Sequence, residues 1–227
     1  MKKFLSITLC VLSVICACAF VSCKNDNLYL QNVSQLRLDV FVGDYNGNTL
    51  TVYPEEKEYP FIYDGNACER KRFVTIKLDN LTSDEIYAEF VIDNETYGSQ
   101  MVFQVLPNAL MCTVEVPTLP QKSLTVSITQ NDSIVKVNTK SVRIGDTVSY
   151  KTAINSVFKQ KKDFIKTLKT HNVLQAEIQA RLLCEDGKNY WYIGFADKKG
   201  NLTAFLIDGK DGKILAEKNQ PAQPRPR

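Results

Sequence analysis

The sequence predicts a mostly β protein with two domains, an N-terminal antiparallel β-sandwich over residues 35–140 and a C-terminal α+β domain over residues 144–217. Three observations lead to this fold class. Short β-prone runs separated by turn-forming residues follow one another between residues 36 and 137. At Gly145 the hydrophobic spacing changes from a period of two to one near 3.6, which is typical of a helix. Further strand-like runs joined by glycine turns then follow this helical segment.

The first 22 residues are similar to a bacterial lipoprotein signal peptide. Lys2 and Lys3 precede an uncharged apolar run over residues 4–21, and Phe20-Val21-Ser22-Cys23 resembles a lipobox. We therefore expect cleavage before Cys23, lipidation of that residue with fatty acids such as palmitate, and membrane anchoring in the bacterial cell envelope. An uncleaved transmembrane anchor over residues 4–21 is the alternative, because that run approaches the length that spans a bilayer. Residues 23–34 are polar and predict a lipidated tether.

The charge balance argues against nucleic acid as a partner. The chain has 28 Lys and Arg against 25 Asp and Glu. Removal of the leader takes away two lysines and no acid, which leaves a net charge of +1. Binding to several phosphates requires a concentration of basic residues that this balance does not provide.

Regular strands and turns predict the N-terminal domain. The turn signals include Asn46-Gly47-Asn48 and Asp64-Gly65-Asn66, and no amphipathic helix interrupts the series. We expect an immunoglobulin-like sandwich, with a partly open barrel as the competing arrangement. The predicted strands are residues 36–42, 49–53, 73–78, 86–92, 101–106, 111–116, 124–129 and 134–137.

One helix on a four-stranded antiparallel sheet is expected for the C-terminal domain. Asp146 or Thr147 can cap the helix. Its apolar stripe consists of Tyr150, Ala153, Ile154, Val157, Phe158, Phe164, Ile165 and Leu168. The strands are predicted over residues 176–184, 190–196, 202–208 and 213–217, with a disordered tail over 218–227.

Residues 144–217 resemble the PepSY domain and related periplasmic modules. The resemblance is carried by Tyr190-Trp191-Tyr192-Ile193-Gly194-Phe195 and by Leu206-Ile207-Asp208 followed by Asp211-Gly212-Lys213-Ile214-Leu215. It implies one helix packed on an antiparallel sheet. It also implies a non-catalytic role in which the domain binds or regulates another envelope protein or a peptide.

The strand over residues 190–196 carries the candidate binding residues. Trp191, Ile193 and Phe195 share one face, which we expect to form the core beneath the helix. Tyr190 and Tyr192 lie on the other face, where tyrosines are effective anchors for a protein or peptide partner.

Candidate catalytic and metal sites are not supported. The single histidine, His171, follows the predicted helix and suits a helix-end residue that faces the negative end of the dipole. Asp208-Gly209-Lys210-Asp211-Gly212 lacks the ligands of a calcium loop and predicts a hairpin turn. Adjacent acids such as Asp84/Glu85 and Glu55/Glu56 point to opposite sides of an extended chain. We therefore expect no enzyme activity, no metal and no cofactor.

Cys68, Cys112 and Cys184 remain after the leader. An odd number of cysteines leaves at least one without a partner in the chain. We expect all three to be reduced, and a Cys68–Cys112 disulfide is the alternative.

A glycan- or surface-binding lipoprotein is the alternative function. In that case the sandwich is the working domain, and its candidate contacts are Tyr45, Tyr53, Tyr59 and Tyr63.

Overall fold

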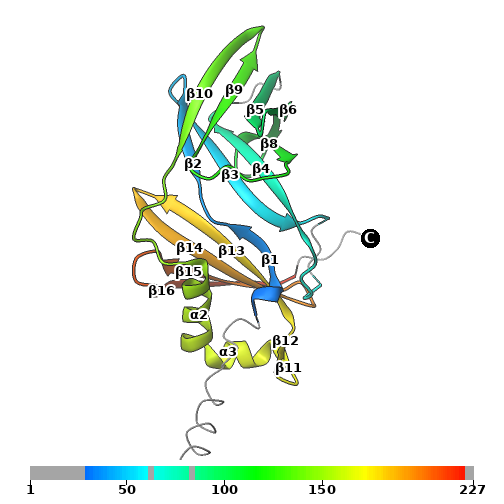
Figure 1. Cartoon of the computed structure of the whole chain (residues 1–227). Helices are drawn as coiled ribbons and strands as arrows, with labels where there is room; N and C mark the ends of the chain where they lie inside the picture. The colour runs from blue at the N-terminus through cyan, green and yellow to red at the C-terminus, as the bar shows by residue number, and fades with distance from the viewer. Residues whose placement is uncertain (1–28, 61–63, 82–84, 223–227) are drawn as a thin grey trace, which may run out of the picture. The chain divides into compact units, whose positions relative to one another are not determined.

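The computed structural model describes residues 29–60, 64–81 and 85–222 (Figure 1). The chain divides into two compact units, residues 1–31 and residues 32–227, and the following description concerns the second. The predicted signal peptide, Cys23 and the last five residues of the tail lie outside the described residues. Within the described ranges, no helix is both long enough and apolar enough to cross a membrane.

The predicted mostly β class is confirmed, since strands make up most of the second unit and the described residues contain only two α-helices. A short 3-10 helix, η1 (Leu30–Asn32), crosses the boundary between the two units. The first ten strands are β1 (Val33–Arg37), β2 (Phe41–Tyr45), β3 (Asn48–Glu58), β4 (Arg70–Asp79), β5 (Ile86–Ile92), β6 (Glu95–Gln100), β7 (Val102–Gln104), β8 (Ala109–Glu115), β9 (Ser123–Gln130) and β10 (Ser133–Ser141).

These strands form one continuous hydrogen-bonded series. On one side of β3, neighbouring strands follow in the order β2-β10-β9-β5-β6. On its other side they follow in the order β4-β8-β7. The series wraps around a core that includes Phe41, Leu50, Ile76, Phe90 and Ile128.

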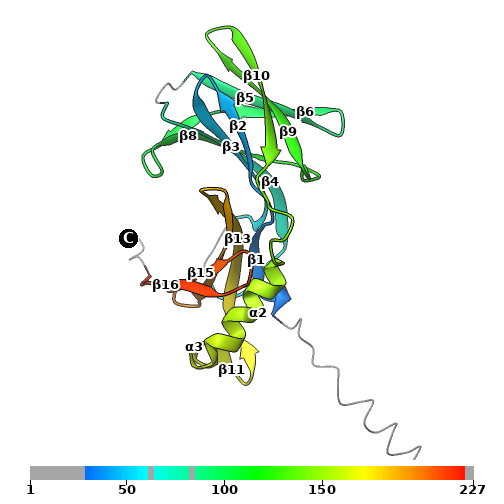
Figure 2. The ribbon, with the colours of Figure 1, turned by 90° about the vertical axis from the view of Figure 1, so that its left-hand side faces the viewer.

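The C-terminal part places two helices on one face of a second set of strands (Figure 2). The helices are α2 (Tyr150–Gln160) and α3 (Lys162–Thr167). The strands are β13 (Ala176–Glu185), β14 (Lys188–Asp197), β15 (Leu202–Asp208) and β16 (Ile214–Gln220), paired antiparallel in chain order.

The interior between helices and strands is rich in aromatic side chains. Trp191 and Ile193 are fully buried and Phe195 is 1 % exposed, as predicted for the core face of this strand. Phe164 packs edge-to-face against Phe195 and Phe205, with ring centroids 5.6 Å and 5.4 Å apart. The indole Nε1–H of Trp191 donates to the carbonyl of Val148 at 2.9 Å, which satisfies its polar group.

β1 connects the two parts of the unit. It pairs antiparallel with β3 and parallel with β13, so the strand order continues from β13 through β1 to β3. β1 begins at Val33, inside the segment predicted to be a tether. Its pairing with β13 joins residues far apart in the sequence, and it adds a parallel strand to the four antiparallel strands predicted for this sheet.

Two strand predictions need correction. The run over residues 36–42 is divided between β1 and β2 by residues 38–40, where the Asp39 side chain accepts a hydrogen bond from the N–H of Val40 at 2.7 Å. β6 was not predicted. It follows a two-residue turn in which Asp93 and Asn94 both have positive φ, 52° and 67°, as a tight hairpin requires.

The helix also differs from the prediction. Ser149, rather than Asp146 or Thr147, is the N-cap, and its side chain accepts from the N–H of Thr152 at 3.1 Å. The helix is interrupted at Lys161, where φ is −115° and ψ is 45°, so two helices replace one.

His171 follows the helical segment, as predicted, but it lies in a hairpin that was not predicted. This turn joins β11 (Lys169–Thr170) and β12 (Val173–Leu174), and His171 and Asn172 have φ values of 49° and 64°. His171 is exposed in this hairpin. At the other end of the domain, β16 reaches Gln220, so the first residues of the predicted tail belong to a strand.

Candidate functional site

The helix-free face of β13, β14 and β15 carries both predicted binding tyrosines. Tyr190 and Tyr192 are half-buried there, opposite the core residues of the same strand. Tyr192 is paired with Arg181 of β13, and Tyr190 is paired with Leu183. The structure thus places both tyrosines on one surface, while their role in binding stays a prediction.

Tyr192 packs against an arginine. The guanidinium carbon of Arg181 lies 4.0 Å from the centre of the Tyr192 ring. This geometry is a cation–π contact, which holds a partly desolvated guanidinium over the ring face. Arg181 is half-buried, so the contact orders the side chain without removing it from solvent.

A second arginine–tyrosine pair lies beside the first. Arg37 of β1 is registered with Arg181 of β13 in the parallel strand pair. The Arg37 guanidinium carbon is 4.4 Å from the centre of the Tyr53 ring on β3. Tyr53, Arg37, Arg181 and Tyr192 therefore form a line across four neighbouring strands, called here the paired-arginine row.

Neither arginine has an acidic partner. Arg37 Nε donates to the carbonyl of Leu182 at 3.2 Å, and Arg181 Nη2 donates to Gln179 Oε1 at 3.3 Å. Arg181 Nε is buried without a hydrogen-bond acceptor. Among the residues that the structure describes, no ion pair involves either guanidinium. Within the described part of the chain, two adjacent positive charges are consequently without an ion-pair partner.

The nearest acid, Glu55, is occupied by other groups. Its side chain is buried, with Oε1 accepting from Lys57 Nζ at 2.8 Å and Oε2 accepting from Gln35 Nε2 at 2.8 Å. Glu55 contributes a favourable electrostatic interaction to Arg37, but it forms no ion pair with that residue.

Burial and neighbouring charges act on the Arg37 pKa. Burial lowers the pKa of Arg37 to about 10; the nearby Tyr53 opposes this decrease, whereas the like charge of Arg181 adds to it. The group remains protonated at neutral pH, because its pKa stays well above 7. The row therefore presents two guanidinium cations side by side.

A loop covers one end of this face. Glu177, fully buried on β13, accepts hydrogen bonds through Oε1 from the N–H groups of Asp64 at 2.9 Å and Gly65 at 3.0 Å. Burial raises the pKa of Glu177, and hydrogen bonding to the N–H groups of Asp64 and Gly65 and to the Ser34 side chain only partly opposes that increase. Asp64 and Gly65 thus contact β13 at Glu177, whereas the paired-arginine row contacts the same strand at Arg181.

Sequence reasoning missed Arg37, Glu177 and Arg181, and it considered Tyr53 only as a possible glycan contact. Arg37 and Arg181 occupy polar positions of alternating strands, which indicates a solvent-facing side. Their adjacency depends on the parallel pairing of β1 with β13, for which no local sequence signal exists.

The tyrosines proposed for glycan binding do not gather at one point. Tyr45 is buried at 4 % exposure, and its hydroxyl group donates to Gln130 at 3.3 Å. Tyr53 belongs to the paired-arginine row, whereas Tyr59 is 65 % exposed and packs near Phe73, with ring centroids 5.8 Å apart. Tyr63 lies outside the described residues.

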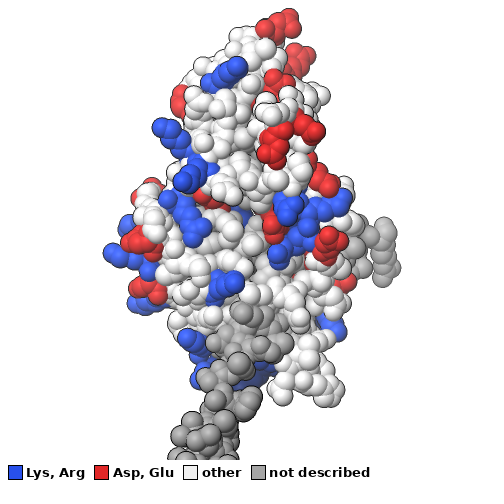
Figure 3. Space-filling model, viewed as in Figure 1, with Lys and Arg blue, Asp and Glu red and all other residues white. Residues whose placement is uncertain are grey.

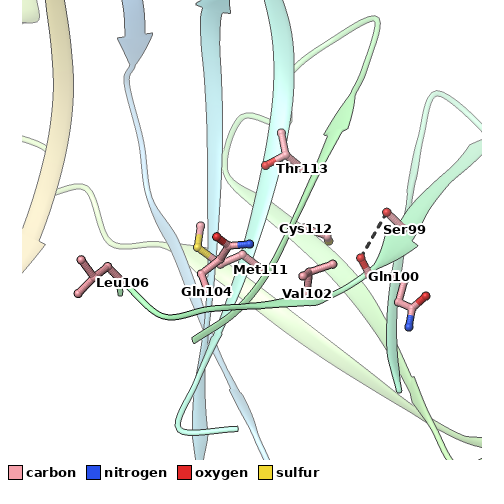
Figure 4. A pocket seen from close by; sticks show the side chains of 8 residues that line it. All are labelled: Ser99, Gln100, Val102, Gln104, Leu106, Met111, Cys112 and Thr113. Atoms are coloured by element: carbon pink, nitrogen blue, oxygen red, sulfur yellow. Dashed lines mark hydrogen bonds between the residues drawn. The ribbon is translucent and has the colours of Figure 1, made fainter. Parts of the chain in front are cut away.

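Two hollows lie elsewhere on the described surface. One, of about 380 Å³, is lined by β6, β7 and β8, and Figure 4 shows its side chains spread along the strands rather than converging on a point. The other, of about 540 Å³, lies against β1 and β3 and is lined by residues that include Leu36, Asp39, Pro54, Arg72 and Arg143. Neither contains a cluster of groups arranged for chemistry.

The expected hairpin at Asp208–Gly212 is present. Asp208 Oδ1 accepts from the N–H groups of Lys210 at 2.7 Å and Asp211 at 3.3 Å, and Gly212 adopts a φ of 75°. Across the described ranges, no group of three or more His, Cys, Asp or Glu residues could hold a metal ion. Asp84, from one of the acid pairs, lies outside those ranges.

The three cysteines are free thiols. Cys68 is exposed, Cys112 is buried and Cys184 is half-buried, so the alternative Cys68–Cys112 disulfide is not formed. Burial raises the pKa of Cys112 to about 11, which suppresses its reactive thiolate form.

The molecular surface has both signs of charge. Figure 3 shows basic and acidic side chains interspersed over the face in view. Comparison with known proteins identifies no relative: no family model matches the chain, and no curated protein or solved structure is significantly similar to it.

Proposed function

We propose that this chain is a non-catalytic, lipid-anchored protein of the bacterial cell envelope that binds or regulates another protein or a peptide. Binding takes place on the helix-free face of residues 176–220, within the C-terminal domain that resembles PepSY modules. The anchor is the acylated Cys23, and the N-terminal β-domain, proposed to be immunoglobulin-like, acts as a spacer. The proposed membrane anchoring is supported by the basic n-region, the apolar run and the lipobox-like Phe20-Val21-Ser22-Cys23.

The paired-arginine row is the observation that supports the binding part. Its tyrosine rings and guanidinium groups are half-buried, and they are the residue types that dominate the free energy of protein interfaces. Each arginine is ordered in advance by a ring, at 4.4 Å for Arg37 and 4.0 Å for Arg181. Side chains that are ordered before binding lose less conformational entropy when a partner docks.

The anchor is tested by metabolic labelling with a fatty-acid probe. The parent chain should be labelled, and Cys23→Ala should lose the label. Equal labelling of the two proteins would exclude acylation at Cys23.

Partner binding is tested by affinity capture from detergent-solubilised envelope with the full chain. Tyr192→Ala should lose captured proteins that the parent retains. Tyr87→Ala is the matched control, because Tyr87 is a 42 % exposed tyrosine on β5, away from the paired-arginine row. A capture pattern that is the same for the parent and Tyr192→Ala would contradict the proposed binding face.

A further inference from the structure

We infer that the paired-arginine row is a carboxylate-binding site, in which the guanidinium groups of Arg37 and Arg181 together hold an acidic side chain or a free C-terminus of a bound peptide. This inference rests on the proposed binding function and specifies the chemistry of its ligand. It is carried by the arrangement of the two arginines within the sheet.

The positive charges of Arg37 and Arg181 favour an anionic ligand. Two cations that are registered on neighbouring strands repel each other, and partial burial strengthens that repulsion. Proteins usually place an acid beside such groups, because an unpaired buried charge is costly. Among the described residues no acid pairs with Arg37 or Arg181, and the nearby Glu55 is already bound by Lys57 and Gln35. A ligand anion would supply the missing charge.

The hydrogen-bond donors of the two arginines favour a carboxylate in particular. Arg37 uses its Nε on the carbonyl of Leu182, and no described group accepts from its two terminal nitrogens. Arg181 uses Nη2 on Gln179, and no described group accepts from its Nη1; its Nε also has no acceptor, but it is buried. Terminal donors therefore remain available on two adjacent planar groups. A carboxylate, with two oxygens in one plane, is the anion that matches such paired donors.

Two tyrosine rings orient the guanidinium groups. The Tyr53 and Tyr192 rings flank the two guanidinium groups, on strands β3 and β14 respectively. Stacking on the rings restrains the arginine planes, so the donors keep their direction before a ligand arrives. A peptide could lay apolar groups on either ring while its carboxylate contacts both arginines.

The test uses the full chain in detergent with ¹⁵N-labelled arginine, and it follows the arginine Nε–H signals by NMR. The probes are N-acetylglycine for a C-terminal carboxylate, N-acetylglutamic acid α-amide for a side-chain carboxylate, inorganic phosphate, and chloride at matched ionic strength. We expect the Arg37 and Arg181 signals to shift saturably with a carboxylate and not with chloride. The more tightly bound of the first two probes identifies a C-terminus or an acidic side chain as the source. Tighter binding of phosphate than of both carboxylates would overturn the inference.

Variants separate recognition from general charge. Arg181→Gln should weaken carboxylate binding by at least about tenfold, because a charge-assisted hydrogen bond contributes about 1.5–3 kcal/mol and tenfold corresponds to about 1.4 kcal/mol. Arg181→Lys should also weaken binding, since it keeps the charge but loses the planar pair of donors. Arg143→Gln is the control, because Arg143 is exposed and belongs to the other hollow. Unchanged affinity in folded Arg181→Gln would overturn the inference.

The outcome is distinguishable from failure of the proposed function. If envelope capture requires Tyr192 but is unaffected by Arg181→Gln, the binding face stands and carboxylate recognition fails. If the isolated carboxylates bind but Tyr192→Ala captures the same proteins as the parent, the anion site stands and the proposed partner face fails.

Discussion

The hydroxyl group of Thr147 donates a hydrogen bond to Asn189 Oδ1 at 2.8 Å, and this contact fastens the turn before α2 to strand β14. The same oxygen accepts from the N–H of Ile144 at 2.6 Å, while Asn189 Nδ2 donates to the carbonyl of Val142 at 3.2 Å. One buried side chain thus holds the whole connection between β10 and the helix.

Replacement of Asn189 by alanine should destabilise the chain by about 2–4 kcal/mol, because three hydrogen bonds are lost and buried polar groups are left without partners. Urea unfolding followed by circular dichroism gives the free energy of unfolding. Asn138→Ala is the control, since Asn138 is exposed and accepts one hydrogen bond from Thr125. Equal stability of the two variants would show that Asn189 does not fasten this connection.

Glycine is required at residue 209 by a close backbone approach. A Cβ at this position would lie 2.3 Å from the carbonyl oxygen of Asn189, and backbone cannot move aside as a flexible side chain can. We expect Gly209→Ala to lower the melting temperature and to cost about 1–3 kcal/mol of unfolding free energy. Gly145→Ala, with no atom within 4 Å of the added Cβ, should leave the melting temperature nearly unchanged. Similar melting temperatures for both alanine variants would contradict this reason.

Glu177 makes stability depend on pH. A carboxyl group whose pKa is raised by folding binds its proton more tightly in the folded chain, so its ionised form opposes folding at neutral pH. That opposition disappears as the pH falls through the folded pKa towards the ordinary value of 4.5. Glu177→Gln keeps an oxygen for the N–H groups of Asp64 and Gly65 but carries no charge. The variant should therefore be more stable than the parent at pH 7, and the difference should shrink by pH 5.

The measurement is urea unfolding of both proteins across that pH range. The pKa of Glu58 is also raised, chiefly by burial and further by the charge of Glu177. The comparison is therefore repeated with Glu58→Gln present in both proteins, so that the titration of Glu58 is not attributed to Glu177. A difference that does not change with pH would show that Glu177 titrates equally in the folded and unfolded chain.

Cysteine accessibility provides a chemical test of the fold. Cys68 is exposed and should react quickly with a thiol reagent in the folded protein, whereas Cys112 should react only after unfolding. With a pKa of about 11, only roughly one Cys112 thiol in ten thousand is ionised at pH 7. Mass spectrometry of the labelled peptides checks the order of reaction, and Cys68→Ser should remove the fast labelling of the peptide that contains residue 68. Fast labelling of Cys112 in the native chain would contradict its position in the core.

Local patterns predicted much of the secondary structure but little of the site. Alternation along residues 190–196 correctly separates buried Trp191 and Ile193 from half-buried Tyr192, because a strand turns successive side chains to opposite faces. The hairpin at His171-Asn172 was missed because neither residue is glycine, although both adopt positive φ.

The paired-arginine row could not be predicted for a different reason. Arg37 and Arg181 meet only because β1 pairs with β13, and the choice of partner among many strands is decided by the packing of the whole sheet. Alternating polarity indicates that each arginine faces outward, but it does not indicate which strand lies beside it.

The place of β1 has a mechanical consequence for a protein proposed to be tethered through its N-terminal end. β1 is the first strand along the chain, and it lies between β3 and β13 with hydrogen bonds on both sides. Tension transmitted through the preceding segment would reach β1 before any other strand. The strand that first bears this force also brings Arg37 beside Arg181, so a pull on the proposed tether would act directly on the proposed anion-binding pair.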